Sequence, residues 1–155
     1  MMITESIGGD GYTKYLENGE ISPRLFLMPT SPHKEFSTLL EEYAAIGAIE
    51  GGINLHKGKV FSSDTVMAEM AHLEQITGKF GCTGLEMESS AVFNAATVTG
   101  MQAAALLLAS DIRSPRKSFP AARTDEEKGK YQRIMHSVLS RIILEALCDE
   151  RLPVI

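Results

Sequence analysis

The stretch that decides the fold is residues 84–93, which read Gly-Leu-Glu-Met-Glu-Ser-Ser-Ala-Val-Phe. A short apolar approach ends in two carboxylates, Glu86 and Glu88, and continues into small residues that are compatible with a helix. This pattern predicts a β-strand that leads directly into an α-helix. The helix is expected to end before Gly100, because a glycine just past a helix readily adopts the left-handed conformation.

A second apolar run, residues 103–109, follows this helix and ends in Ser110 and Asp111. The run has no polar alternation, which is typical of a central strand that is covered on both faces. Residues 84–111 are therefore predicted to form a strand–helix–strand unit with a right-handed crossover. If the two strands are parallel neighbours, their polar ends share one edge of the sheet, where open α/β sheets bind their ligands.

Local patterns predict the remaining elements. Strands or extended segments are expected over residues 2–7 and 24–28, with one or two strands within 51–63 around a turn at Lys57 and Gly58. Helices are expected from Ser31 and Pro32 to Gly47, from Thr65 to Gly78, and from a capping box at residues 124–127 to Leu147. The fold class is α/β, a mixed and largely central sheet flanked by helices, in a single domain over residues 1–155. The last helix is amphipathic and is expected to cover the sheet.

Composition excludes several classes of function. The formal net charge is −5, and no dense cluster of Lys and Arg suggests a nucleic-acid partner. The longest apolar run is too short to cross a bilayer, and the start of the chain lacks the features of a signal peptide. We therefore expect a cytoplasmic protein with no nucleic-acid or membrane partner.

No cofactor or metal is expected from the residues either. Cys82 and Cys148 have no zinc-type or disulfide-framework spacing. The histidines also lack metal-ligand spacing, and they are His33, His56, His72 and His136.

Glu88 and Asp111 are the candidates for chemistry. A carboxylate at a strand end can accept two hydrogen bonds from a vicinal diol such as that of ribose. A structural role is the alternative: Glu88 is also placed to interact with the helix dipole, and Asp111 could cap its loop through Ser114 or pair with Arg113. From spacing alone, the structural role is favoured at both positions.

Three motifs together change this balance. Residues 86–91 (Glu-Met-Glu-Ser-Ser-Ala), 108–111 (Leu-Ala-Ser-Asp) and 61–64 (Phe-Ser-Ser-Asp) resemble segments of the nucleoside phosphorylase/nucleosidase superfamily. That superfamily includes purine nucleoside phosphorylase, uridine phosphorylase and methylthioadenosine nucleosidase. The motifs occur in the family's order with family-like separations. The resemblance covers nearly the whole chain and corresponds to the carboxyl-terminal part of a family member, so the domain is expected to be a partial one.

The resemblance implies a role for each matching residue. Met87 would pack against the sugar, Glu88 would bind its hydroxyls, and Glu86 would support the same pocket. The implied substrate pocket also contains Ser63, Val66 and Ser110, with Val66 near the position where the family often has a base-stacking phenylalanine.

The implied catalytic residues are Asp111 and Arg123. Asp111 would protonate, or hydrogen-bond, the purine N7 as the glycosidic bond breaks. General acid catalysis of this kind contributes roughly 10²–10⁴ in rate. Arg123 would support the protonated state, and Arg113 and Arg116 are alternatives for that role.

Departures from the family leave the reaction open. The family's phosphate loop and phosphate-binding arginines lie upstream of the matched region, with no equivalent in this chain. Attack by inorganic phosphate as co-substrate, or by water, is therefore undecided. Asp111 favours purines, whereas Glu-Met-Glu-Ser-Ser is closer to the uridine branch, whose uracil-reading residues are replaced by Met70 and His72.

Two further readings concern what the chain does as a whole. A truncated, non-catalytic relative could bind a nucleoside or serve only as an oligomerising remnant, and the missing half could also exist as a separate chain. A homo-oligomer is expected in either case, because active sites in the family often borrow residues across a subunit interface.

Overall fold

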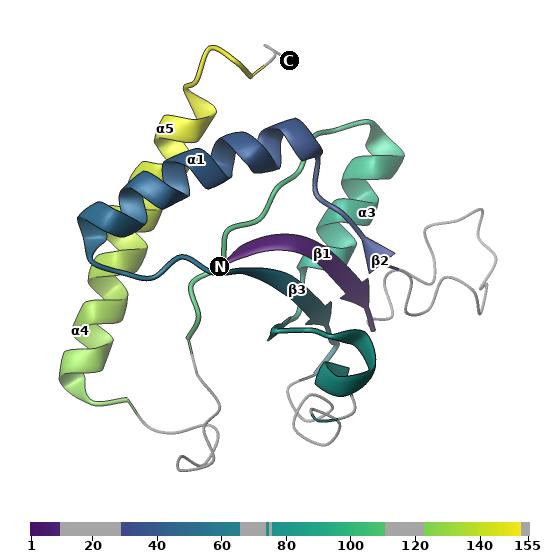
Figure 1. Ribbon diagram of the computed structural model, residues 1–155, viewed down its shortest axis with the longest axis horizontal. Coiled ribbons are helices and arrows are strands. Elements are labelled where there is room, and N and C mark those ends of the chain that lie inside the picture. Colours follow the sequence, from purple (N-terminus) through teal and green to yellow (C-terminus); the bar gives the residue numbers. More distant parts are fainter. Residues whose placement is uncertain (10–28, 66–73, 75, 111–122, 153–155) are drawn as a thin grey trace. The chain divides into compact units, whose positions relative to one another are not determined.

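The computed structural model describes residues 1–9, 29–65, 74, 76–110 and 123–152 (Figure 1). The chain divides into two compact units. The first, here called the sheet unit, comprises Met2–Ser37 and His56–Ala105. The second, here called the helical unit, comprises Met1, Thr38–Leu55 and Leu106–Ile155.

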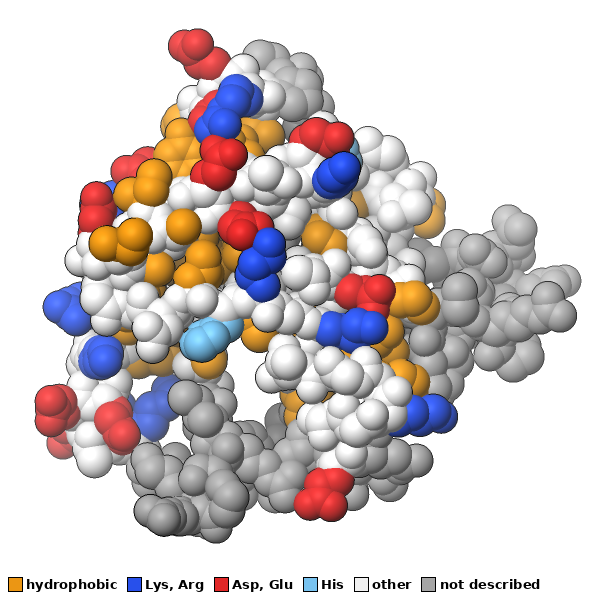
Figure 2. Space-filling model, in the orientation of Figure 1, with side chains coloured by type: hydrophobic (Ala, Val, Ile, Leu, Met, Phe, Trp, Pro, Cys, Tyr) orange, Lys and Arg blue, Asp and Glu red, His pale blue; other side chains and the backbone are white. Residues whose placement is uncertain are grey.

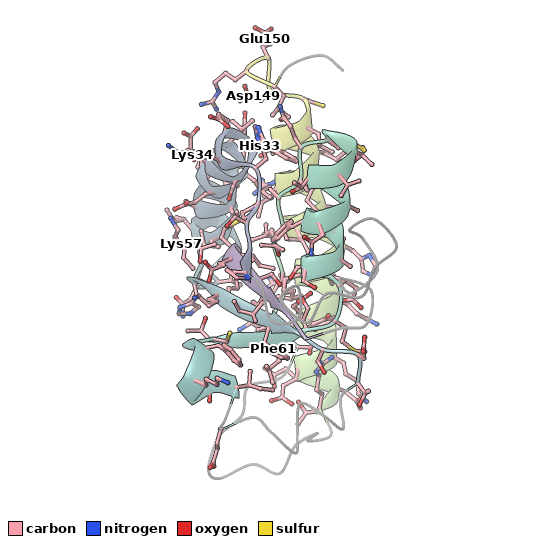
Figure 3. All side chains as sticks on the ribbon, turned by 90° about the vertical axis from the view of Figure 1, so that its right-hand side faces the viewer. His33, Lys34, Lys57, Phe61, Asp149 and Glu150 are labelled. Atoms are coloured by element: carbon pink, nitrogen blue, oxygen red, sulfur yellow. The ribbon has the colours of Figure 1, made fainter. Side chains whose placement is uncertain are left out.

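A mixed four-stranded sheet forms the centre of the sheet unit, in the order β2-β1-β3-β4. Its strands are β1 (Met2–Gly8), β2 (Pro29–Thr30), β3 (Lys57–Ser62) and β4 (Gly84–Glu86). β3 runs parallel to both β1 and β4, while β2 runs antiparallel to β1. Figure 3 labels Lys57 and Phe61 toward the two ends of β3. The mixed sheet confirms the predicted fold class.

The register aligns the carboxyl ends of the parallel strands. Gly8 of β1 pairs with Ser62 of β3, and Ser62 in turn pairs with Glu86 of β4. The sheet is held by a buried cluster that joins strand residues to the segment before β4: Ile7, Phe61, Ile76 and Cys82, with Phe80 and Leu85 packed against them. The predicted strand at residues 2–7 is confirmed.

Helix α3 (Ser89–Thr99) follows β4 directly, as the sequence predicts. It packs against β1, β2 and β3, and its Phe93 side chain is 1% exposed. Gly100 has a φ of 70° and ends the helix in the left-handed conformation. The predicted strand–turn–helix and its glycine cap are therefore confirmed.

The predicted central strand at residues 103–109 is wrong. Within residues 101–110, Leu106 alone carries an isolated bridge. The backbone makes scattered hydrogen bonds, such as Ile3 N to Ala105 O at 3.2 Å and Leu107 N to Met1 O at 2.9 Å. The run is half-buried over most of its length, so its apolar residues reflect burial without the continuous ladder that defines a strand.

Helix α1 (Lys34–Gly51) starts in the sheet unit and has most of its length in the helical unit. It begins after His33, whose Nδ1 accepts the Phe36 N–H at 3.4 Å, rather than at Ser31 and Pro32. Figure 3 labels His33 and Lys34 at this end. The predicted end at Gly47 is also wrong, because the helix continues to Gly51.

The predicted roles of Gly58 and Gly78 are also wrong. Lys57 and Gly58 belong to β3 instead of forming a turn, and a Cβ on Gly58 would lie 2.0 Å from Thr83 Oγ1. Gly78 lies inside a helical segment, residues 76–80, and Gly81 has the positive φ of 64°. The extended segment predicted at 24–28 lies outside the described residues.

A continuous helical segment completes the helical unit: α4 (Asp125–Arg133), the π-helix η2 (Ile134–Leu139) and α5 (Ser140–Leu147). The predicted capping box is confirmed, since Thr124 Oγ1 accepts the Glu127 N–H and the Glu127 carboxylate accepts the Thr124 N–H. Coverage of the sheet by this segment stays a prediction. Figure 2 shows hydrophobic side chains at the surface over α1 and α5. The large hydrophobic residues that are exposed on these two helices include Ile46, Ile49, Leu144 and Leu147.

Among the described residues, no helix combines the length and apolar character needed to cross a membrane.

Candidate functional site

The candidate site is the turn between β4 and α3 in the sheet unit. It contains Glu86, Met87 and Glu88, and it lies at the sheet edge where β1, β3 and β4 end. This placement is the one that the sequence predicts for the two carboxylates.

The Glu86 carboxylate is held by three donors. Its Oε2 accepts the Ser89 N–H at 2.6 Å and the Glu88 N–H at 2.8 Å, and its Oε1 accepts the Ser62 hydroxyl. Glu88 stands at the N-cap position of α3, but its side chain makes no capping bond. Glu86 therefore supplies the acceptor that the first N–H groups of the helix require.

Buried serines surround this carboxylate. Ser6, Ser62, Ser89 and Ser90 are each 4% exposed or less. The hydroxyls of Ser6 and Ser62 lie 2.8 Å apart, the Ser89 hydroxyl donates to Ser6 at 3.0 Å, and the Ser90 N–H donates to Ser62 Oγ at 3.0 Å. Sequence reasoning missed this network; the available signal was a serine near the end of each of two neighbouring strands.

Glu88 and Met87 face solvent. The Met87 residue is 40% exposed, and the Glu88 residue is exposed as well. Glu88 Oε2 accepts the Met87 N–H at 3.3 Å. The turn therefore presents a carboxylate and an apolar thioether side by side, at the edge predicted to bind a ligand.

Ser63 follows β3 and is 3% exposed. Its hydroxyl donates to Thr65 O at 3.0 Å and accepts the Thr65 N–H at 3.3 Å, while its own N–H donates to Glu86 O at 2.9 Å. In this structure Ser63 shapes the loop beside the turn. Val66 and Asp111 lie outside the described residues.

Ser110 and Arg123 belong to the helical unit. Arg123 Nη2 donates to Ser110 O at 2.8 Å, and the guanidinium carbon lies 4.5 Å from the centroid of the Tyr131 ring. Arg123 thus holds the backbone of the residue that precedes Asp111. In the described part of the chain, no group of His, Cys, Asp and Glu side chains is arranged to hold a metal ion.

Comparisons with known sequences identify the family to which this arrangement belongs. The sequence model described as "Phosphorylase superfamily" matches residues 1–147. Purine nucleoside phosphorylase of the DeoD type from Listeria monocytogenes is 36% identical over 81 residues, which are 52% of this chain and 34% of that protein. The same enzyme from Oceanobacillus iheyensis is 33% identical over 82 residues, and the match again spans only 34% of its length.

Solved structures show the same fold at low sequence identity. The 5'-methylthioadenosine/S-adenosyl homocysteine nucleosidase of Campylobacter jejuni superposes with a TM-score of 0.63 at 18% identity, over 94% of this chain and 59% of that chain. The futalosine hydrolase of Helicobacter pylori gives 0.61 at 13% identity, over 94% and 57%. The family match over residues 1–147 and the shared fold lead to one conclusion: this chain belongs to the phosphorylase superfamily.

Proposed function

We propose that the β4–α3 turn binds the ribose of a nucleoside and that the chain takes part in cleaving the nucleoside's N-glycosidic bond. The observation that carries this proposal is the exposed pair of Glu88 and Met87, held at the carboxyl edge of three parallel strands. The names of the relatives in two comparisons, phosphorylases and nucleosidases, support the same chemistry.

The side chains of the turn suit a ribose ring. The Glu88 carboxylate has two oxygens that accept hydrogen bonds, and the 2′- and 3′-hydroxyls of ribose are adjacent donors. Hydrogen bonds to a charged acceptor are stronger than neutral ones, so this contact both binds and orients the sugar. Met87 offers an adaptable apolar surface for the carbon face of the ring.

Bond cleavage requires help for the departing base. In this proposal a nucleophile attacks C1′, the C1′–N bond breaks, and Asp111 donates a proton to the base, which then leaves as a neutral molecule. A proton donated in the transition state removes the negative charge that would otherwise develop on the base. The hydrogen bond from Arg123 to Ser110 O supports a role for Arg123 in positioning the segment that leads to Asp111.

The nucleophile is inorganic phosphate or water, and the base is a purine in the first instance. The purine preference is supported by Asp111 and by the names of the purine nucleoside phosphorylases that match this chain. Phosphate would give ribose 1-phosphate, whereas water would release a proton as it bonds to C1′ and would give free ribose.

The test is a turnover assay on the full chain with adenosine, inosine and uridine, each with and without inorganic phosphate. We expect release of the free base, with the sugar product identifying the nucleophile. The D111N variant should slow release by roughly 10²–10⁴, the range for loss of a general acid. Absence of base release with all three nucleosides contradicts the proposal, and binding without release supports a non-catalytic nucleoside-binding relative.

A further inference from the structure

We propose that Glu86 is a positioning residue: its carboxylate, together with a chain of buried serine hydroxyls, fixes the turn that presents Glu88 to the sugar. This inference rests on the proposed role of Glu88. It assigns Glu86 a different task from the direct support of the sugar pocket that the family resemblance implies.

Three donors already occupy most of the Glu86 carboxylate. A carboxylate offers about four acceptor positions. Two backbone N–H groups on Oε2 and the Ser62 hydroxyl on Oε1 take three of them, and both backbone donors belong to the turn or to the first residue of α3. These bonds set where the backbone of Glu88 lies, because the Glu88 N–H is one of the donors.

The serine hydroxyls have a defined direction. An ionised carboxylate has no proton to give, so Ser62 must donate to Glu86. Ser62 Oγ then accepts from Ser6, and Ser6 accepts from Ser89. Ser62 also accepts the Ser90 N–H, so the donor and both acceptor positions of its hydroxyl are used.

The hydrogen-bonded series of serine hydroxyls links the turn to the sheet. Ser6 lies in β1, Ser62 ends β3, and Ser89 begins α3. Ser6 and Ser89 are 83 positions apart in the sequence, and Ser62 and Glu86 are 24 apart. Three elements are therefore joined at one point, next to the turn that carries the exposed Glu88. Because Ser62 is fully buried, it cannot itself contact a sugar. A substitution of Ser62 therefore tests positioning without removing a direct contact to the sugar.

Two variants of Glu86 separate positioning from direct binding. In E86Q the amide oxygen can still accept both backbone N–H groups, and the amide N–H₂ can donate to Ser62 once the serine hydroxyls reverse their direction. E86Q should therefore keep the turn in place without the negative charge. E86A removes every acceptor and should release it.

The experiment measures calorimetric affinity for adenosine, inosine and uridine and for the 2′,3′-dideoxy form of each. The readout is discrimination between the ribose and the dideoxyribose, which depends on the placement of the Glu88 carboxylate. We expect wild type to favour the ribose form by about tenfold or more, as lost bonds to a charged group imply. E86Q should retain this ratio, and S62A and E86A should lose most of it.

T97V serves as the matched control. Thr97 lies in the same helix and its hydroxyl donates to Phe93 O at 2.9 Å, so the variant removes one hydroxyl from α3 far from the turn. Its discrimination ratio should equal that of wild type.

A second readout does not depend on nucleoside binding. Hydrogen exchange of the Glu88 and Ser89 amides should be slow in wild type and E86Q, and faster in S62A and E86A. If wild type does not discriminate the two sugars, the proposed function fails, and the exchange rates still test the positioning role. If wild type discriminates but E86Q loses the ratio, or S62A keeps it, the positioning inference is overturned. Should E86A not fold, S62A and E86Q decide the question.

Discussion

Glu86 and Glu88 flank Met87 on one short turn, yet their carboxylates have different surroundings. Glu86 accepts two backbone N–H groups and a buried hydroxyl, while the Glu88 residue is exposed. The Glu86 side chain turns toward the first N–H groups of α3, whereas Glu88 stays at the surface. Sequence spacing places both carboxylates at the sheet edge, but it does not predict that one is held by hydrogen bonds and the other is exposed.

Substitution of Glu88 tests its proposed role in binding the sugar. E88A should weaken adenosine or inosine binding by about tenfold or more, because hydrogen bonds to a charged group are lost. The dideoxy form should bind E88A and wild type equally. The matched control is E126A, which removes the same charge from the exposed first turn of α4. Equal affinity of E88A and wild type for the ribonucleoside would contradict the assignment.

At the scale of elements, α1 shows how packing overrides a local signal. Gly47 reads as a helix stop, but it is buried inside α1, and a Cβ there would lie 2.5 Å from Ile142 Cγ1 of α5. The glycine lets the two helices approach closely. The left-handed glycine is Gly52 instead, with a φ of 62°, just past the end of the helix.

G47A should therefore destabilise the protein by about 1–3 kcal/mol, the usual cost of overpacking a core. Thermal unfolding measures the change. The double variant G47A/I142A should be less destabilised than the sum of its two single variants, because alanine lacks the Cγ1 and Cδ1 atoms that a Cβ on residue 47 would meet. The control is G129A in α4, where a Cβ meets nothing within 4 Å and alanine favours the helix. A G47A protein as stable as wild type would show that Ile142 moves aside at no cost.

At the scale of the whole chain, an ionic network holds the segment after α5. Arg151 donates to Asp149 through Nε at 2.9 Å and Nη2 at 2.8 Å, and to Glu42 of α1 through Nη1 at 2.8 Å. The Tyr43 hydroxyl also donates to Asp149 at 2.7 Å. Figure 3 labels Asp149 beyond α5. Arg151 and Tyr43 hold the pKa of the Asp149 carboxyl well below its ordinary value of 3.8.

This shift predicts a pH dependence of stability. A carboxyl group with a lowered pKa in the folded state stabilises the fold above its unfolded-state pKa, and this contribution is lost as the pH falls through 3.8 toward the folded-state value. D149N should therefore lower the thermal midpoint at pH 7, and the gap from wild type should narrow below pH 3.8. Y43F should give a smaller loss. D125N is the control, because the Asp125 side chain is 98% exposed. A difference in thermal midpoint between D149N and wild type that stays constant with pH would contradict the prediction.

Assembly and the placement of the last helix stay predictions at this scale. A homo-oligomer is implied by the family resemblance, and the exposed apolar side chains of α1 and α5 favour it (Figure 2). The family resemblance also assigns Asp111 and Val66 to the site, and both lie outside the described residues.

The sequence by itself determined the features that depend on neighbours along the chain. The strand, turn and helix of residues 84–100 follow from local apolar pattern and a glycine cap, and the capping box at Thr124 follows from a bond between residues three apart. The three spaced motifs also identified the family. Only the tertiary structure decided the environments of Gly47 and Gly58 and the hydrogen-bond partners of Glu86. Each depends on residues distant in sequence, such as Ile142, Thr83 and Ser62, and no local pattern specifies which of them will meet.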